Sequence, residues 1–165
     1  MALQPSSHAA EQYTQTSDKL AARLATHSYN THPQDWFSWV RGRIVETGDI
    51  LEVGAGTGQL WRGTGIAGVL LTLIDFSAAM CAKLKEIPGA KVVQVDATRL
   101  LFPDANLDTV IANHMLYHID DPDAALRELR RILRPGGQLV ISLNGAEHII
   151  ELIEVGKLVG RPGFV

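Results

Sequence analysis

Three glycines lie at alternate positions in the stretch ILEVGAGTGQLW, immediately after a run of apolar residues. Gly54, Gly56 and Gly58 would allow the main chain to turn in a left-handed conformation or to approach a ligand closely. A helix after such a turn would add the positive end of its dipole, which favours a ligand at that point. The alternative is a tight turn between a strand and a helix that binds nothing.

Two aspartates close the next two apolar runs. Asp75 ends LTLID, twenty-one residues after Gly54, and Asp96 ends VVQVD. An acid about twenty residues beyond a glycine turn is at the spacing expected for a partner of ribose hydroxyls, since a carboxylate can accept both hydroxyl protons. Either aspartate alone could simply cap its loop. Together, beside a glycine turn, they favour a nucleoside ligand.

Short aliphatic runs must position these residues. Their near-continuous Val, Ile and Leu content is typical of strands buried on both faces of a parallel sheet. We expect strands at 49–54, 69–75, 90–96, 107–113 and 137–143. We expect helices at 9–25, at 34–46, at 77–87 with Ser77 as N-cap, and from Asp121 to the turn Pro135-Gly136-Gly137. This alternation predicts a doubly wound α/β fold, in which ligands bind at the carboxyl ends of the strands.

The composition narrows the function classes. A chain of 165 residues suits one domain, here divided into an N-terminal helical segment at 1–47 and an α/β core at 48–165. A net charge of -3 argues against nucleic acid as a partner. Neither a signal peptide nor an apolar run of membrane-spanning length stands in the sequence. The single cysteine, Cys81, is expected to be a small buried thiol, and we expect the protein in the cytoplasm.

Several motifs in this order resemble one family. LEVGAGTG, LIDFS, VDATRLLFPDANLDTVIANHMLYHIDD and LRELRRILRPGGQLVIS are similar to the core of class I S-adenosylmethionine-dependent methyltransferases, in the small-molecule group that includes quinone-biosynthesis C-methyltransferases. The resemblance covers residues 50–143. It implies a Rossmann-like, mainly parallel sheet of order 3-2-1-4-5, S-adenosylmethionine as the cofactor, and a small molecule as the methyl acceptor.

The resemblance also implies roles for particular residues. Glu52, an acid inside the first strand motif, would orient the glycine turn or the ammonium group of the cofactor. The remaining positions are assigned as follows: Gly54, Ala55, Gly56 and Gly58 to the methionine and ribose, Asp75 to the ribose hydroxyls, Phe76 and Met80 to the surroundings of the adenine, Asp96 to its amino group, Ala97 to its ring through the backbone N–H, and Asn113 and His114 to the methionine moiety.

Methyl transfer from a sulfonium is an in-line displacement, so holding the acceptor in line with the S–CH3 bond supplies much of the catalysis. A hydroxyl or carbon acceptor would also need a general base, and His114 is the candidate. His118 is expected to be structural. Because HMLYH lacks the Glu of a zinc-binding HExxH motif, we expect no metal site. A nicotinamide enzyme is disfavoured, since GAGTG departs from the GxGxxG spacing.

Two further segments flank this core. In related enzymes the N-terminal segment helps to form a lid over cofactor and acceptor; Tyr13 and Tyr29 are our candidates, while Trp36 and Trp39 could equally anchor helices to the sheet. Four arginines form a basic stripe that we interpret as the solvated face of an amphipathic helix; they are Arg127, Arg130, Arg131 and Arg134.

The sequence departs from the family pattern near its end. The family's sheet has seven strands, whereas this chain stops at RPGFV after the helix-like stretch GAEHIIELIEVGKLVG. The fifth strand would then be an open apolar edge. Two alternatives would account for it: the chain is a fragment of a longer protein, or a partner chain covers the edge in a homo-oligomer. The alternative function is therefore a truncated or non-catalytic S-adenosylmethionine-binding module that oligomerises.

Overall fold

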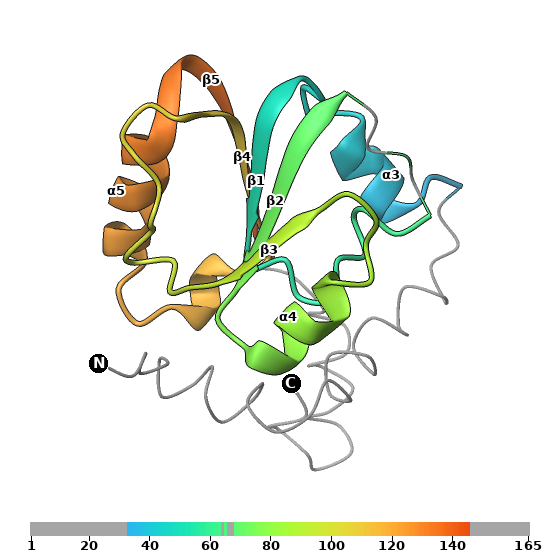
Figure 1. The fold of residues 1–165 in the computed structure, drawn as a ribbon, viewed down its shortest axis with the longest axis horizontal. Helices are drawn as coiled ribbons and strands as arrows, with labels where there is room; N and C mark the ends of the chain where they lie inside the picture. Colours follow the sequence, from blue (N-terminus) through green and yellow to red (C-terminus); the bar gives the residue numbers. More distant parts are fainter. Residues whose placement is uncertain (1–32, 64, 66–67, 146–165) are drawn as a thin grey trace.

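The computed structural model describes residues 33–63, 65 and 68–145. Within this part of the chain, five strands form one sheet in the order β3-β2-β1-β4-β5 (Figure 1), and every pairing between neighbours is parallel. The strands are β1 (Gly48–Val53), β2 (Val69–Asp75), β3 (Lys91–Gln94), β4 (Leu107–Asn113) and β5 (Leu133–Ser142). The strand order expected for a Rossmann-like fold is confirmed.

Helices pack on both faces of this sheet. They are α3 (Trp36–Arg41), α4 (Ala78–Leu84), α5 (Pro122–Ile132) and the short 3-10 helix η2 (Leu116–His118). In Figure 1, α5 lies on one side of the sheet and α3 and α4 lie on the other. The order reverses at β1, which pairs with β2 on one side and β4 on the other. The carboxyl ends of β1 and β4 therefore border the crevice in which such folds bind ligands.

The core has two layers, one on each face of the sheet. Leu51 of β1 packs in the layer on the α5 side with Leu129, whereas Ile50 packs in the opposite layer with Leu84 of α4. Ile50 and Leu51 are both fully buried. A strand covered on both faces needs consecutive apolar residues rather than an alternating pattern, which explains the aliphatic runs in the sequence.

Helix α3 is shorter than the expected helix at 34–46. The Asp35 carboxylate accepts a hydrogen bond of 2.8 Å from the Ser38 N–H and caps the start. The helix ends at Gly42, and the chain then turns toward β1, with the Val45 N–H donating to Gln138 Oε1 at 2.8 Å. The expected length was wrong because this crossing to β5 takes the chain out of the helical path. The expected helix at 9–25, Tyr13 and Tyr29 all lie outside the described residues.

The junction of α5 and β5 also differs from expectation. The helix ends at Ile132 and β5 begins at Leu133, four residues before the expected strand at 137–143. Leu133 is 7% exposed and pairs with Leu107, and a register shift follows before the ladder resumes at Gln138. Gly136 adopts a φ of 80° in this irregular stretch. The turn residues therefore form a bulge within the strand instead of preceding it.

Strand β5 forms one edge of the described sheet. No described strand pairs with its outer side, and Leu139 and Ile141 are each 37% exposed. The helix-like stretch expected to follow lies almost entirely outside the described residues, so no covering element for this edge can be assigned from them.

Asp121 caps α5, and its replacement by alanine is expected to destabilise the fold by about 1 kcal/mol. The Asp121 carboxylate accepts a hydrogen bond of 2.8 Å from the Ala124 N–H, and Pro122 occupies the first turn. Urea denaturation monitored by circular dichroism measures the loss. Asp120→Ala is the matched control, because it removes the same charge one residue outside the cap. An equal loss in the two variants would contradict the capping role.

Candidate functional site

The glycine turn follows β1 directly. Gly54, Gly56 and Gly58 have φ values of 66°, 57° and 73°, in the left-handed region that favours glycine. The Ala55 N–H donates to Ile74 O at 3.0 Å, and the Gly58 N–H donates back to Ala55 O at 2.9 Å. The described residues after this turn form further turns and no regular helix. The described residues therefore provide no helix whose dipole could favour a ligand at the glycine turn.

Asp75, at the end of β2, is bonded directly to the glycine turn. Its Oδ2 accepts from the Gly56 N–H at 2.9 Å and its Oδ1 accepts from the Ser77 N–H at 2.8 Å. Burial raises the pKa of this carboxyl, whereas the backbone N–H groups of Ser77 and Gly56 favour its charged form. Each oxygen has capacity for a further hydrogen bond. The carboxylate can therefore shape the loop and still accept from a diol.

Glu52 lies inside the sheet and is 4% exposed. Its Oε2 accepts a hydrogen bond of 2.6 Å from Trp61 Nε1, and its Oε1 accepts one of 3.3 Å from Asn113 Nδ2. Asn113 Oδ1 in turn accepts from Ser142 Oγ at 3.0 Å. Burial raises the pKa of Glu52 to about 7, and the nearby Asp75 charge adds to the effect. A polar chain thus connects β1, β4 and β5 beneath the glycine turn.

The residues assigned to the adenine lie around the ends of β2 and β3. The Val95 N–H donates to Asp75 O at 3.2 Å, which joins these two strand ends. Asp96 Oδ1 accepts from both the N–H and the hydroxyl of Thr98, each at 2.8 Å. Phe76 and Asp96 are partly exposed, Ala97 is buried and Met80 is only 2% exposed. Phe76 and Asp96 are therefore accessible to a ligand, while Met80 lies in the core.

His114 follows β4 in a left-handed conformation, with a φ of 48°. Its N–H donates to Ser142 O at 3.0 Å, which continues the pairing of β4 with β5. Its ring lies 5.2 Å from the ring of Trp36 and 6.4 Å from that of Tyr117, between centroids. Trp36 stacks on Trp39 at 5.4 Å. The carboxyl end of β4 is thus bordered by aromatic rings from α3 and η2.

The sequence alone leaves the role of Trp36 open and does not distinguish Trp61 as a site residue. Trp36 and Trp39 pack against the core layer on the α3 side, as the anchoring alternative expects, and Trp36 also contacts His114. Trp61 is 1% exposed and bonds Glu52, nine residues earlier. A tryptophan shortly after a glycine turn is a weak signal, because only the folded turns bring its indole back to the strand.

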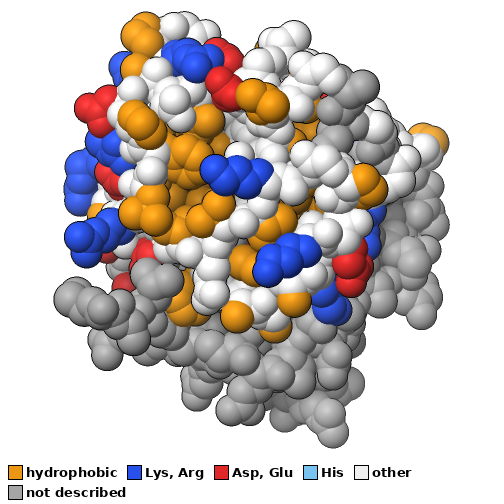
Figure 2. Space-filling view, in the orientation of Figure 1, with side chains coloured by type: hydrophobic (Ala, Val, Ile, Leu, Met, Phe, Trp, Pro, Cys, Tyr) orange, Lys and Arg blue, Asp and Glu red, His pale blue; other side chains and the backbone are white. Residues whose placement is uncertain are grey.

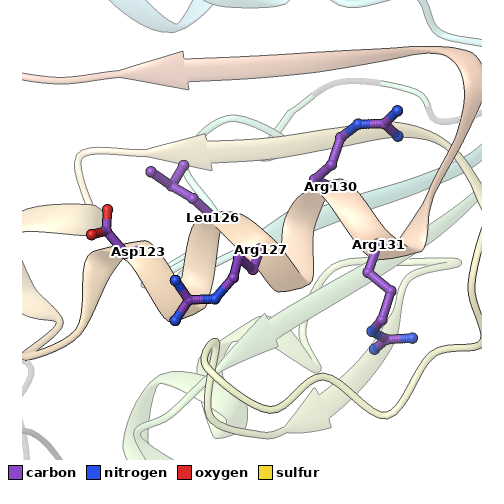
Figure 3. A pocket seen from close by; sticks show the side chains of 5 residues that line it. All are labelled: Asp123, Leu126, Arg127, Arg130 and Arg131. Carbon is purple, nitrogen blue, oxygen red and sulfur yellow. The ribbon is translucent and has the colours of Figure 1, made fainter.

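Three arginines of the expected stripe lie on α5, whereas Arg134 lies in β5 and pairs with Asp49 and Asp108. Arg131 pairs with Glu128 and Asp104 at 2.7 Å, and Figure 2 shows Lys and Arg mixed with Asp and Glu on the α5 side of the molecule. An open hollow on this helix is lined by Asp123, Leu126, Arg127, Arg130 and Arg131 (Figure 3). None of these residues belongs to the expected cofactor site. The stripe therefore fits a solvated helix face.

Other expectations concern Cys81, metals and membranes. Cys81 is a buried free thiol, and burial raises its pKa, as expected of a structural cysteine. Among the described residues, no three His, Cys, Asp or Glu side chains come together as a set that could hold a metal ion. Within the same residues, no helix combines the length and apolar character needed to cross a membrane.

An open parallel sheet whose order reverses at β1, with a glycine turn bonded to the acid that ends β2, defines a Rossmann-like α/β class of protein. Residues 51–141, more than half of the chain, match the family described as a methyltransferase domain. The chain belongs to this family. Membership favours an enzyme over the alternative of a non-catalytic binding module.

Two curated relatives illustrate the similarity. A phosphatidylethanolamine N-methyltransferase from Cereibacter sphaeroides is 36% identical over 121 residues, which cover 69% of this chain and 59% of that protein. A demethylmenaquinone methyltransferase from Renibacterium salmoninarum is 35% identical over 94 residues, which cover 56% of this chain and 40% of that protein. The chain therefore spans about half the length of the curated relatives that it matches.

Solved structures show the same fold. An S-adenosylmethionine-dependent methyltransferase from Thermotoga maritima superimposes with a TM-score of 0.72 at 20% identity, covering 92% of this chain and 70% of that one. The [4+2]-cyclase SpnF superimposes with a TM-score of 0.59 at 24% identity, covering 78% of this chain and 60% of that one. Since a cyclase shares the fold, the reaction must be argued from the site.

The buried carboxyl of Glu52 leads to a pH-dependent prediction for Glu52→Gln. The folded-state pKa of about 7 lies above the ordinary 4.5. Between these values the folded protein holds a proton that the unfolded chain has lost, so this group lowers stability as pH rises through that window. Glutamine removes the effect. We expect the variant and the unaltered protein to be similarly stable at pH 5, and the variant to be more stable by about 2 kcal/mol at pH 8.

Urea denaturation of both proteins at pH 5 and at pH 8, without cofactor, measures this difference. The comparison is internal to each pH, so the titration of other groups cancels. A difference in unfolding free energy that stays the same at the two pH values would contradict a raised pKa for Glu52.

Proposed function

We propose that this chain binds S-adenosylmethionine at the carboxyl ends of its strands and transfers the methyl group to a small-molecule acceptor by in-line displacement. The observation that carries the proposal is the hydrogen bond between the Gly56 N–H and Asp75 Oδ2. It brings the glycine turn and the acid for the ribose together at the reversal of strand order, in a chain that belongs to the methyltransferase domain family.

Each end of the cofactor has candidate partners. Asp75 would accept the ribose hydroxyls with its remaining lone pairs, and Gly54, Ala55, Gly56 and Gly58 would line the ribose and methionine. Glu52, in its charged form, would attract the cofactor's ammonium group, with Asn113 beside it. Asp96 and the Ala97 N–H would receive the adenine, with Phe76 along its exposed side. Met80 is too deeply buried for a broad contact, so we propose that it supports Phe76 from the core.

The main task of the protein in this reaction is to orient the acceptor. The cofactor supplies a methyl group already activated by the positive sulfonium, so the chain must align the acceptor and exclude water. For a hydroxyl or carbon acceptor, His114 would take the proton, because it lies at the end of β4 beside the proposed methionine site. The left-handed backbone of His114 directs its ring toward Trp36 of α3. An amine acceptor would need orientation more than a base.

We also propose a lid, a contact with a second copy of the chain, and a cytoplasmic location. The contact between Trp36 and His114 supports a lid role for the 1–47 segment, of which α3 is described. Exposed Leu139 and Ile141 on β5 support a contact with a second copy of the chain. A cytoplasmic location agrees with the free thiol of Cys81. The relatives' names suggest two acceptors to test first, an aminophospholipid and a demethylated quinone.

Isothermal titration calorimetry with S-adenosylmethionine and with S-adenosylhomocysteine tests the cofactor. We expect both to bind with 1:1 stoichiometry. Transfer of a labelled methyl group to phosphatidylethanolamine vesicles or to a demethylated quinone then tests the reaction. Absence of binding by either nucleoside would contradict the proposal at its first step.

A further inference from the structure

Trp61 is the group that holds Glu52 most closely. Its indole N–H, which can donate but not accept, lies 2.6 Å from Glu52 Oε2. A hydrogen bond of this length is typical of a charged acceptor and is stronger than one between neutral groups. Trp61 is 1% exposed, so neither partner can exchange this bond freely for one with water. The ring therefore has a polar function in addition to filling the core.

Trp61 has one contact through its backbone and another through its ring. The backbone N–H of Trp61 donates to Gly58 O at 3.0 Å, which attaches the residue to the glycine turn. On the α3 side, the Arg41 guanidinium lies 5.0 Å from the ring centroid, a cation–π arrangement. Arg41 is fixed by Glu46 at 2.6 Å and by Gly65 O at 2.9 Å. Two elements thus determine where the indole N–H points.

The surroundings of Glu52 otherwise oppose its negative charge. Burial disfavours the ionised form, and Asp75 at the end of β2 repels it. Asn113 of β4 donates to Glu52 through a longer bond of 3.3 Å, and the Ser142 hydroxyl of β5 donates to Asn113. The cation from α3, Arg41, lies over the face of the Trp61 ring, whereas Glu52 accepts from the N–H at the edge of that ring. His114 follows Asn113 in the chain. Trp61 is therefore the main donor that stabilises the charge.

We propose that Trp61 is a positioning residue whose indole N–H keeps Glu52 ionised and aimed at the ammonium group of S-adenosylmethionine. This inference rests on the proposed cofactor site. It assigns to Trp61 no contact with the cofactor; the residue acts through Glu52. It also makes α3 part of the cofactor site, because Arg41 holds the indole in place.

The test measures the affinity for S-adenosylhomocysteine by calorimetry between pH 6 and pH 8. For the unaltered protein we expect the affinity to rise about tenfold over this range, since the ionised fraction of a group with a pKa of about 7 rises about tenfold. The comparison ligand is 5′-methylthioadenosine, which has the nucleoside but no ammonium group. Its affinity is expected to stay nearly constant with pH, and its binding reports that each variant is folded.

Two variants of Trp61 distinguish the effect of its indole N–H from the effect of its aromatic ring. Trp61→Phe keeps an aromatic ring without a donor, and we expect the midpoint of the pH profile to rise by about one pH unit. Trp61→Gln keeps an N–H donor without the ring, and we expect its midpoint to stay near that of the unaltered protein. Trp39→Phe is the matched control, because Trp39 stacks on Trp36 and not on the glycine turn. The cofactor's own amino group titrates identically in every sample.

The outcomes are decisive for either variant that folds. A raised midpoint in Trp61→Phe supports the proposal, and an unchanged one overturns it and leaves Trp61 a packing residue. If Trp61→Phe does not fold, Trp61→Gln decides: an unchanged midpoint supports the proposal, and a rise equal to that expected for phenylalanine overturns it. If neither nucleoside binds the unaltered protein, the proposed function itself has failed, which is a different result from a profile that ignores Trp61.

Discussion

Replacing Asp75 by alanine is expected to weaken the binding of S-adenosylhomocysteine about a hundredfold, by about 3 kcal/mol. The carboxylate would accept two ribose hydroxyls, and hydrogen bonds to a charged acceptor contribute more than neutral ones. The same carboxylate accepts from the Gly56 N–H and the Ser77 N–H, so its loss also loosens the turn against which the cofactor packs. Calorimetry on both proteins at the same pH measures the change.

Two comparisons sharpen this result. Asp75→Asn keeps one acceptor oxygen and should lose less affinity than Asp75→Ala. Asp104→Ala is the matched control, because Asp104 is an exposed acid that pairs with Arg131 on the α5 side. Thermal denaturation without ligand checks that the variants are folded. If Asp75→Ala binds the nucleoside as tightly as Asp104→Ala does, Asp75 does not receive the ribose.

Gly54→Ala is expected to destabilise the fold by about 3 kcal/mol and to abolish measurable cofactor binding. Gly54 has a φ of 66°, and a Cβ built on it would lie 2.7 Å from the Cβ of Met115. Met115 cannot move this atom without moving its own backbone, in the segment between β4 and η2. The strain therefore combines an unfavourable backbone conformation with a clash at the base of a side chain, and its relief would displace the glycine turn.

Gly63→Ala provides a control that separates these two causes. Gly63 has a similar φ of 72°, but a Cβ there would meet no atom of the described residues within 4 Å. Its substitution should cost only about 1 kcal/mol, from the backbone conformation, and should leave cofactor affinity nearly unchanged. Urea denaturation and calorimetry on both variants make the comparison. Equal losses of stability would show that the contact with Met115 contributes nothing.

Much of the fold follows from local patterns in the sequence. The aliphatic runs located all five described strands, since a strand such as Ile50 to Val53 must be apolar on both faces to lie between two layers of helices. The ends of elements were less predictable. Helix α3 stops early because Gly42 and the contact of Val45 with Gln138 redirect the chain, and β5 starts early because Leu133 pairs with Leu107. Both causes are contacts between residues far apart in the sequence.

The residues of the candidate site could be named from the sequence, but the contacts between them could not. Order and spacing in the sequence were enough to name the glycine turn, Asp75, Asp96 and His114 as candidates, because residues that end parallel strands must meet at one edge of the sheet. The order of the motifs did not show which of these residues form hydrogen bonds with one another. Gly56 bonds Asp75, and Glu52 bonds Asn113, only because β1 lies between β2 and β4.

The sequence by itself determined the class of fold, the family and the edge of the sheet at which a nucleoside would bind, because periodicity and motif order are local properties. Only the tertiary structure decided the environment of each charge. Glu52 is an ordinary acid in the sequence. In the folded chain, burial and, to a smaller extent, the charge of Asp75 raise its pKa to about 7, while hydrogen bonds from Trp61 and Asn113 oppose this rise. Burial and hydrogen bonding are properties of the packed chain, so the pKa of Glu52 could not be predicted from the sequence.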